Sequence, residues 1–183
     1  MKLVETPIKD LFVIEPSFFP DNRGYFLVGY SAEEFAKVGL KFNFMQDNQS
    51  KSTYGVIRGM HYQIGENVQT KLVRAVQGSI FDVALDCRRS SPTFGKWFGI
   101  ELSDDNQKQL LVPKGFAHGF LVLSDVAEFL YKTTDYWASQ HERAILWNDP
   151  DLAIKWPLQS PPILSVKDAN GMLFKEAETF KTL

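Results

Sequence analysis

Three side chains that could bind or deprotonate a substrate lie close together in residues 55–74, which read GVIRGMHYQIGENVQTKLVR. His61 can act as a base near neutral pH, because the reference pKa of histidine is about 6.5. Arg58 offers planar, bidentate donors for a phosphate, and Lys71 can stabilise a negative or developing negative oxygen in a semi-dry cavity. These side-chain types fit acid–base chemistry beside an anionic group.

Three other segments carry groups that could face this stretch. Residues 113–120 (PKGFAHGF) place His118 between two small residues, which lets a backbone or ligand approach closely. Residues 126–134 (VAEFLYKTT) place Tyr131 on the same strand face as Phe129. Residues 165–168 (SVKD) end in Asp168. We expect the four segments to line one pocket.

Each of these residues also has a simpler structural interpretation. A single histidine in a strand and a buried tyrosine are more often structural, and a lysine stem on an apolar face can reach out to solvent. Asp168 could serve only to cap a helical turn that begins at Ser165. Strict alternation would place Arg58 on the opposite face from His61, unless a bulge at Gly59 brings them together.

Composition restricts the class of protein. The 183 residues are 44% hydrophobic and 23% charged, so we predict one folded domain over residues 1–183. A net charge of -2 gives no reason to expect nucleic acid or an anionic membrane as a partner, and no stretch is apolar enough to span a bilayer. The single cysteine, Cys87, and a charged N-terminus unlike a signal peptide favour a cytoplasmic protein.

The elements that must position these groups are predicted to be strands. Turn residues recur about every eight to twelve positions, which is typical of an all-β jelly-roll barrel or sandwich with a few short helices. One helix should begin at Ser31, with Glu34 completing a capping box and Gly39 ending it, and should cover an edge or end of a sheet. Residues 71–86 read as a hairpin that turns at Gly78 and Ser79. The other expected strands are residues 11–15, 25–30, 42–48, 96–102, 109–112, 120–123 and 126–134, with a polar loop over 49–55 and a C-terminal segment over the barrel end.

A metal site is the alternative explanation for two histidines in such a barrel. The spacing around His61 and His118 resembles the two cupin motifs, in which metal-binding members have His-x-His, a Glu and a later His. In this sequence Gln63 replaces the second histidine, and Glu66 comes one residue too early. An amide is a weak ligand for zinc or iron, and the ammonium of Lys71 would repel a divalent cation. We therefore predict a cupin barrel without a metal.

Taken together, segments along nearly the whole chain resemble the dTDP-4-dehydrorhamnose 3,5-epimerase family. The resemblance implies a jelly-roll cupin that works without a metal or organic cofactor, and a homodimer whose N-terminal strands cross to the partner. The segments that carry it, in the family's order and spacing, are FFPDNRGYF, FMQDNQSKS, GVIRGMHYQ, KLVRAVQGSIFDVALDCRRSSPTFGKW, LVPKGFAHGFLVLSD, EFLYKTTDYW, LWNDPDLAIKWP and LSVKDA.

The resemblance also implies a role for each site residue. His61 would abstract the proton, Asp168 would orient it, and Tyr131 would return a proton. Lys71 would lie near the sugar and diphosphate, and on physical grounds its ammonium is the obvious cation for an enolate oxygen. The substrate-binding residues would be Arg58 and His118 near the sugar and diphosphate, Arg23, Gln46 and Asn48 for a nucleotide of the neighbouring subunit, Trp137 on the base, and Glu142 and Lys167.

One position departs from the family pattern, in which RGYF is followed by one residue and then Glu. Here that position is Val28, which puts a strict preference for the deoxythymidine nucleotide in question. The expected function is epimerisation at carbon 3, carbon 5 or both of a nucleotide-linked 4-keto-6-deoxyhexose. The alternatives are a single-site epimerase of a related nucleotide sugar, a non-catalytic cupin that binds one, and a metal-dependent cupin dioxygenase.

Overall fold

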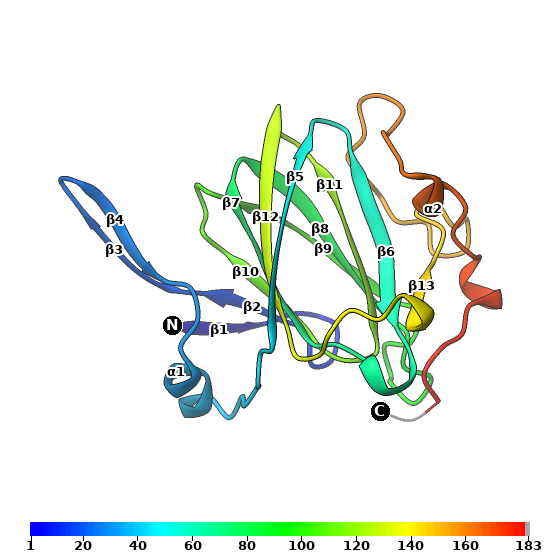
Figure 1. Cartoon of the computed structure of the whole chain (residues 1–183), viewed down its shortest axis with the longest axis horizontal. Helices are drawn as coiled ribbons and strands as arrows, with labels where there is room; N and C mark the ends of the chain where they lie inside the picture. Colours follow the sequence, from blue (N-terminus) through cyan, green and yellow to red (C-terminus); the bar gives the residue numbers. More distant parts are fainter. Residues whose placement is uncertain (182–183) are drawn as a thin grey trace.

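In the computed structural model, which describes residues 1–181, two antiparallel sheets pack into a sandwich (Figure 1). The six-stranded sheet runs in the order β1 (Lys2–Glu5), β2 (Phe12–Glu15), β10 (Gln109–Val112), β7 (Lys71–Gln77), β12 (Val126–Thr133) and β5 (Gln46–Thr53). The five-stranded sheet runs in the order β13 (Glu142–Ala144), β6 (Ile57–Gln63), β11 (Phe116–Val122), β8 (Ser79–Asp86) and β9 (Trp97–Ser103). The prediction of an all-β jelly-roll sandwich is confirmed. The single domain over 1–183 stays a prediction, and residues 182 and 183 lie outside the described range.

Alternation along the strands places apolar side chains between the two sheets. Val73 and Ala75 on β7 pack with Phe129 on β12 and with Ile80 and Ala84 on β8, all of them buried. Burial of this kind stabilises a fold by roughly 25 cal/mol per Å² of apolar surface removed from water. This buried core therefore holds the two sheets at a fixed distance from each other.

Helix α1 (Ala32–Lys37) begins where the sequence predicts. The Ser31 hydroxyl accepts a hydrogen bond from the Glu34 amide at 3.3 Å, so Ser31 is the N-cap. The Glu34 carboxylate does not return to the cap, because it binds Ser17 and the N-terminal amine instead. Phe35 is fully buried against Leu72 and its neighbours, so α1 covers the outer face of the six-stranded sheet and not an edge or end.

The predicted hairpin over residues 71–86 is wrong in its pairing. Strands β7 and β8 occur where the sequence predicts them, but β7 pairs with β10 and β12, whereas β8 pairs with β9 and β11. Gly78 adopts a positive φ of 70°, and its amide donates to the Asp104 carboxylate. The turn is therefore a corner at which the chain passes from one sheet to the other.

Two further expectations need correction. The strand predicted from residue 42 begins at Gln46 and continues through the predicted loop to Thr53, because β5 pairs with β12 along its whole length. Strand β5 is polar since it is the sheet edge and half of its side chains are exposed. In the C-terminal segment, Leu152, Ile154 and the 3₁₀ turn at Phe174–Glu176 cover the outer face of the five-stranded sheet and not the barrel end (Figure 1). Helix α2 (Val166–Ala169) instead lies beside β6, where Lys167 and Asp168 line the cavity between the sheets.

Strands β3 (Ser17–Asp21) and β4 (Gly24–Val28) form a ribbon that projects away from the sandwich (Figure 1). Its apolar side chains are exposed, with Phe19 at 56% and Phe26 at 66%. Within residues 1–181, no helix is long and apolar enough to cross a membrane.

Candidate functional site

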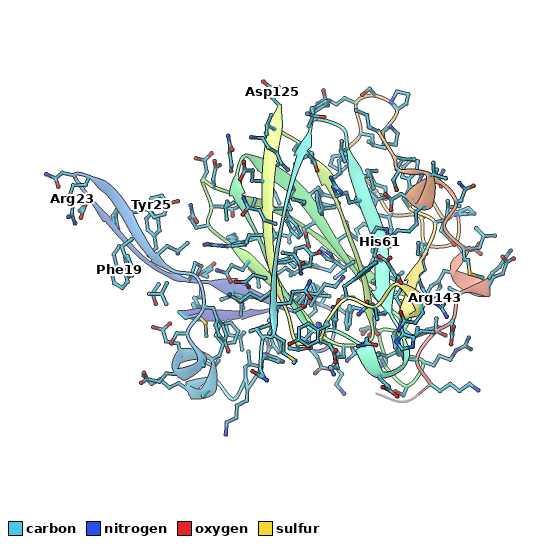
Figure 2. The ribbon with its side chains drawn as sticks, viewed as in Figure 1. Phe19, Arg23, Tyr25, His61, Asp125 and Arg143 are labelled. Atoms are coloured by element: carbon cyan, nitrogen blue, oxygen red, sulfur yellow. The ribbon has the colours of Figure 1, made fainter. Side chains whose placement is uncertain are left out.

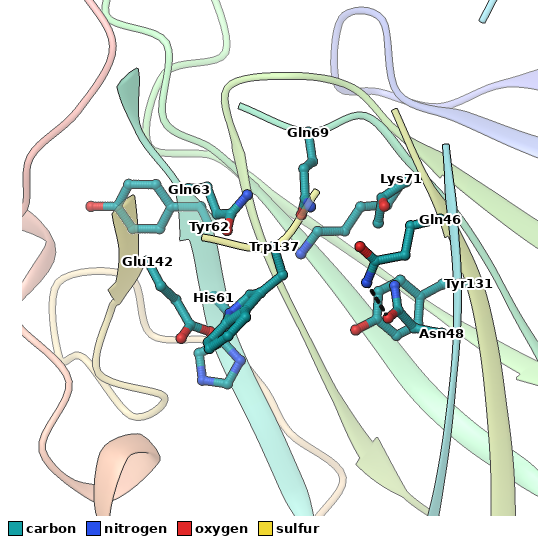
Figure 3. A pocket seen from close by; sticks show the side chains of 11 residues that line it. Gln46, Asn48, His61, Tyr62, Gln63, Gln69, Lys71, Tyr131, Trp137 and Glu142 are labelled. Atoms are coloured by element: carbon teal, nitrogen blue, oxygen red, sulfur yellow. Dashed lines mark hydrogen bonds between the residues drawn. The ribbon is translucent and has the colours of Figure 1, made fainter. Parts of the chain in front are cut away.

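Two adjoining cavities of about 370 and 240 Å³ open between the sheets. His61, Lys71, Tyr131 and Asn48 line both of them, so they form one connected site. His61 belongs to the five-stranded sheet, and the other three residues belong to the six-stranded sheet. The structure therefore brings together the groups that the sequence singled out for acid–base chemistry (Figure 3).

The His61 imidazole meets a buried carboxylate. Nε2 of His61 lies 2.5 Å from Oδ1 of Asp168, so the carboxylate faces that ring nitrogen. Asp168 also accepts from the Gly59 amide at 3.2 Å and from the Ser165 hydroxyl at 2.6 Å. Burial alone would raise the pKa of Asp168, but His61 and these donors lower it below its usual value, so the group remains a carboxylate. Asp168 also takes part in the predicted cap, since its amide donates to Ser165.

The bulge expected at Gly59 is present. His61 pairs with His118 across the ladder, whereas Arg58 pairs with Phe120, so β6 has one residue more than β11 between the two pairs. Gly59 has a φ of +128°, which an L side chain rarely adopts. As a result Arg58 lines the same cavity as His61 and donates to the Ser52 hydroxyl on β5 at 2.9 Å.

Lys71 and Tyr131 reach the cavity from the six-stranded sheet. Within residues 1–181 no carboxylate lies within 4 Å of the Lys71 ammonium, and burial lowers its pKa to about 8, with Glu142 and Asp82 opposing part of the shift. Burial raises the pKa of Tyr131, which keeps its hydroxyl protonated at neutral pH. Tyr131 packs against Phe129, with ring centroids 5.4 Å apart.

His118 has a partner that the sequence analysis missed. Its Nε2 lies 2.9 Å from both carboxylate oxygens of Asp82, which is fully buried. The available signal was a charged residue, Asp82, at an inward position between apolar residues of the run IFDVALD. Asp82 fixes the His118 ring on the wall of the larger cavity.

Polar and aromatic side chains form the rim of the smaller cavity (Figure 3). Gln46 donates to Asn48 at 2.7 Å, and both residues line the cavity of their own chain, whereas the prediction assigned them to the nucleotide of a neighbouring subunit. Trp137 is 60% exposed at the mouth. Further lining residues that the sequence analysis did not select are Gln63, Gln69, Thr133, Gln49, Ser50, Phe120, Phe129 and Ser165.

Glu142 and Lys167 bind each other at this rim, with Oε1 and Nζ 2.7 Å apart. Burial alone would raise the pKa of Glu142, but the ammonium of Lys167 lowers it below its usual value. Glu142 lies beside His61 and Trp137 in Figure 3.

Arg23 and Val28 lie outside this cavity. Arg23 is at the tip of the β3–β4 ribbon, 2.6 Å from Asp21, and Figure 2 shows it far from His61. Its assignment to a neighbouring subunit stays a prediction. Among residues 1–181, no three His, Cys, Asp or Glu side chains converge in a way that could hold a metal ion.

Comparison with known proteins identifies the family of this chain. A profile of the dTDP-4-dehydrorhamnose 3,5-epimerase family matches residues 5–176. The dTDP-4-dehydrorhamnose 3,5-epimerase of Pseudomonas aeruginosa is 54% identical over 181 residues, which span 98% of this chain and 99% of that protein.

Solved structures of epimerases are also similar to this chain. The epimerase of Legionella pneumophila, solved with dTDP-4-keto-L-rhamnose, superposes with a TM-score of 0.95 at 44% identity, over 100% of this chain and 98% of that one. A 3′-monoepimerase of Streptomyces bikiniensis, solved with dTDP-quinovose, superposes with a TM-score of 0.89 at 31% identity, over 94% and 87% of the two chains. The protein is therefore an isomerase that belongs to the dTDP-4-dehydrorhamnose 3,5-epimerase family.

Proposed function

We propose that this enzyme inverts both carbon 3 and carbon 5 of dTDP-4-dehydro-6-deoxyglucose. The observation that carries the proposal is that His61 and Tyr131 come from opposite sheets and line one cavity with the ammonium of Lys71. An inversion needs a base on one face of a carbon and a proton donor on the other. A protein that only bound the sugar nucleotide would not need both.

The first step is removal of a proton next to the ketone at carbon 4. The C–H electron pair moves into the ring, and the negative charge passes to the ketone oxygen as an enolate. Because Asp168 faces Nε2 of His61, that nitrogen keeps its hydrogen, and the lone pair on Nδ1 accepts the proton. The buried carboxylate of Asp168 stabilises the imidazolium that forms.

The second step returns a proton from the opposite face. The Lys71 ammonium stabilises the enolate oxygen, since a cation in a semi-dry cavity interacts strongly with developing charge. The Tyr131 hydroxyl gives its proton to the carbon, and the ketone re-forms. His61 and Tyr131 then regain their starting protonation states by exchange with water.

The remaining lining residues suit the nucleotide diphosphate. Arg58 and His118 supply donors for phosphate oxygens, and the exposed Trp137 supplies a surface on which the base can stack. The amides of Gln46 and Asn48 suit hydrogen bonds to the nucleoside. The epimerase of Bacillus anthracis, which is similar to this chain, has been solved with TDP and pyrophosphate bound.

We further propose that the enzyme is a homodimer in the cytoplasm, with the β3–β4 ribbon packed on the partner. A two-stranded ribbon is marginally stable alone, and exposed apolar patches of this kind mark interaction sites. Phe19 and Tyr25 are both exposed on it, beside Arg23 (Figure 2). The free, buried Cys87 suits a reducing compartment. Light scattering on a sizing column should give twice the chain mass, and Phe19→Asp should give a monomer; a monomeric wild-type protein would exclude the dimer.

Incubation with the 4-keto sugar in deuterated water tests the proposed reaction. NMR should find deuterium at both carbon 3 and carbon 5, with loss of incorporation in His61→Ala and only a modest fall in ligand affinity. Deuterium at one carbon would identify a single-site epimerase, as in the monoepimerase relative, and would contradict double inversion. No incorporation above the His61→Ala background would exclude epimerisation altogether.

A further inference from the structure

The chain between β12 and β13 carries Trp137 at the mouth of the smaller cavity. Residues 136–138 belong to no helix or strand, and the Trp137 side chain is 60% exposed beside Glu142 (Figure 3). A side chain that is mostly exposed has little packing to fix its orientation. The backbone on either side of Trp137 must therefore determine where the indole ring lies.

Gln63 holds this backbone on both sides of Trp137. Its Oε1 accepts from the Ala138 amide at 2.7 Å, and its Nε2 donates to the Tyr136 carbonyl at 3.1 Å. Nε2 also donates to the Asn67 carbonyl at 2.6 Å. Since Gln63 is only 5% exposed, its amide lies largely out of water, where such hydrogen bonds are stronger.

The place of Gln63 in the fold connects this loop to the strand of the base. Gln63 is the last residue of β6, two positions after His61, so the two side chains share one face of the strand and line the same cavity. A glutamine amide has two N–H groups, and here both of them bind backbone carbonyls. Gln63 therefore has no free donor for a substrate, although it lines the cavity.

We propose that Gln63 is a positioning residue, whose side-chain amide holds the loop so that Trp137 stands at the cavity mouth and can stack on a nucleobase. The residue that replaces the second histidine of a metal-binding cupin thus orients the surface that receives the base. The inference rests on the proposed function, because it deepens the part of that function that concerns the nucleotide.

The first test uses the free protein and does not depend on any activity. The Ala138 amide donates to Gln63, so its hydrogen exchange reports whether the loop is held. Gln63→Met keeps a long side chain but removes the amide, and it should speed Ala138 exchange. The Ile64 amide, which donates to the His141 carbonyl at 3.0 Å, should stay protected. Loss of protection at both amides would mean that the whole cavity mouth opens, which would contradict a specific hold on Trp137.

The second test compares ligands with and without a base. Trp137→Ala should weaken TDP binding roughly 5- to 100-fold, because stacking a base on an aromatic ring usually contributes that much. Gln63→Met should lose part of this, roughly 3- to 10-fold, and should lose nothing further when Trp137 is already alanine, since it acts through that ring. Binding of pyrophosphate, which has no base, should not change. With the sugar nucleotide, KM should rise more than kcat falls.

The matched control is Gln109→Met. Gln109 is likewise buried, and its amide donates to a backbone carbonyl, that of Gly29, at 2.9 Å, but it belongs to β10 in the other sheet. This variant should leave Ala138 exchange unchanged. If Gln63→Met does not fold, Gln63→Asn takes its place, because its amide is one methylene too short to bind both sides of Trp137, and it should also speed Ala138 exchange.

Unaltered Ala138 exchange in the Gln63 variant would overturn the inference. Equal weakening of TDP and pyrophosphate would overturn it as well, because the effect would then not pass through the base. A wild-type protein that bound no TDP would contradict the proposed nucleotide, whereas Ala138 exchange would still decide whether Gln63 holds the loop.

Discussion

Lys71 shows how burial can set the chemistry of a single residue. Its side chain shares the inward face of β7 with Val73 and Ala75, and it extends into the cavity where solvation is poor. Burial lowers its pKa to about 8 from the usual 10.5 of a lysine. The Lys71 ammonium is therefore present below about pH 8 and is lost above it.

This shift predicts a limit on activity at alkaline pH. For the free enzyme, kcat/KM should fall with a midpoint near pH 8, because neutral Lys71 cannot stabilise the enolate. Lys71→Arg keeps its charge at all these pH values and should move the limit upward. A pH profile of kcat/KM for both proteins checks this. If kcat/KM of the variant fell at the same alkaline pH as that of the wild type, the fall would be due to another group.

Tyr131→Phe separates the two proton transfers. Loss of the hydroxyl removes the donor but leaves His61 able to abstract, so product formation should slow by roughly 10²-fold or more, while solvent exchange at the substrate carbons slows much less. Parallel measurement of product and of deuterium uptake checks the difference. Equal losses would mean that Tyr131 has no special part in reprotonation.

At the scale of elements, the Gly59 bulge gathers Arg58 and His61 into one cavity. A Cβ at Gly59 would lie 2.4 Å from the Cα of Gly119, which is a backbone atom that cannot move aside cheaply. We predict that Gly59→Ala destabilises the protein by roughly 3 kcal/mol or more and removes most activity. Thermal unfolding and initial rates measure both effects.

Gly55→Ala is the control for that prediction. Gly55 also has a positive φ, of 76°, but nothing lies within 4 Å of an added Cβ. The cost should be about 1 kcal/mol, with near-normal activity, since only the backbone preference is lost. If both variants lost the same stability, the close approach to Gly119 would not matter.

Part of the arrangement of these elements could be predicted from the sequence. Most strand positions and the start of the capped helix follow from local alternation and turn residues, and so do the inward positions of Lys71 and Tyr131. Pairing is not local: nothing in residues 71–86 indicates that the turn at Gly78 joins two sheets. Asp82 was missed for the same reason, because its partner His118 is 36 positions away.

At the scale of the whole molecule, a ribbon shared between subunits would make each active site composite. Arg23 lies at the ribbon tip, remote from His61 of its own chain (Figure 2). A mixture of His61→Ala and Arg23→Ala proteins, unfolded and refolded together, should regain about a quarter of wild-type activity, because half of the dimers would hold one intact site. Refolding each variant alone is the control, and no gain on mixing would place Arg23 outside the partner's site.

The base and the proton donor belong to different layers of the sandwich, His61 to one sheet and Tyr131 to the other. The distance between His61 and Tyr131, into which a sugar ring must fit, is thus set by side chains between the sheets. Among them are Phe120 and Phe129, whose ring centroids lie 4.4 Å apart across the two layers. These rings act as spacers. Larger or smaller side chains at these two positions would change which carbon of the sugar lies near the Tyr131 hydroxyl. The stereochemical outcome can therefore change during evolution while His61 and Tyr131 are both retained.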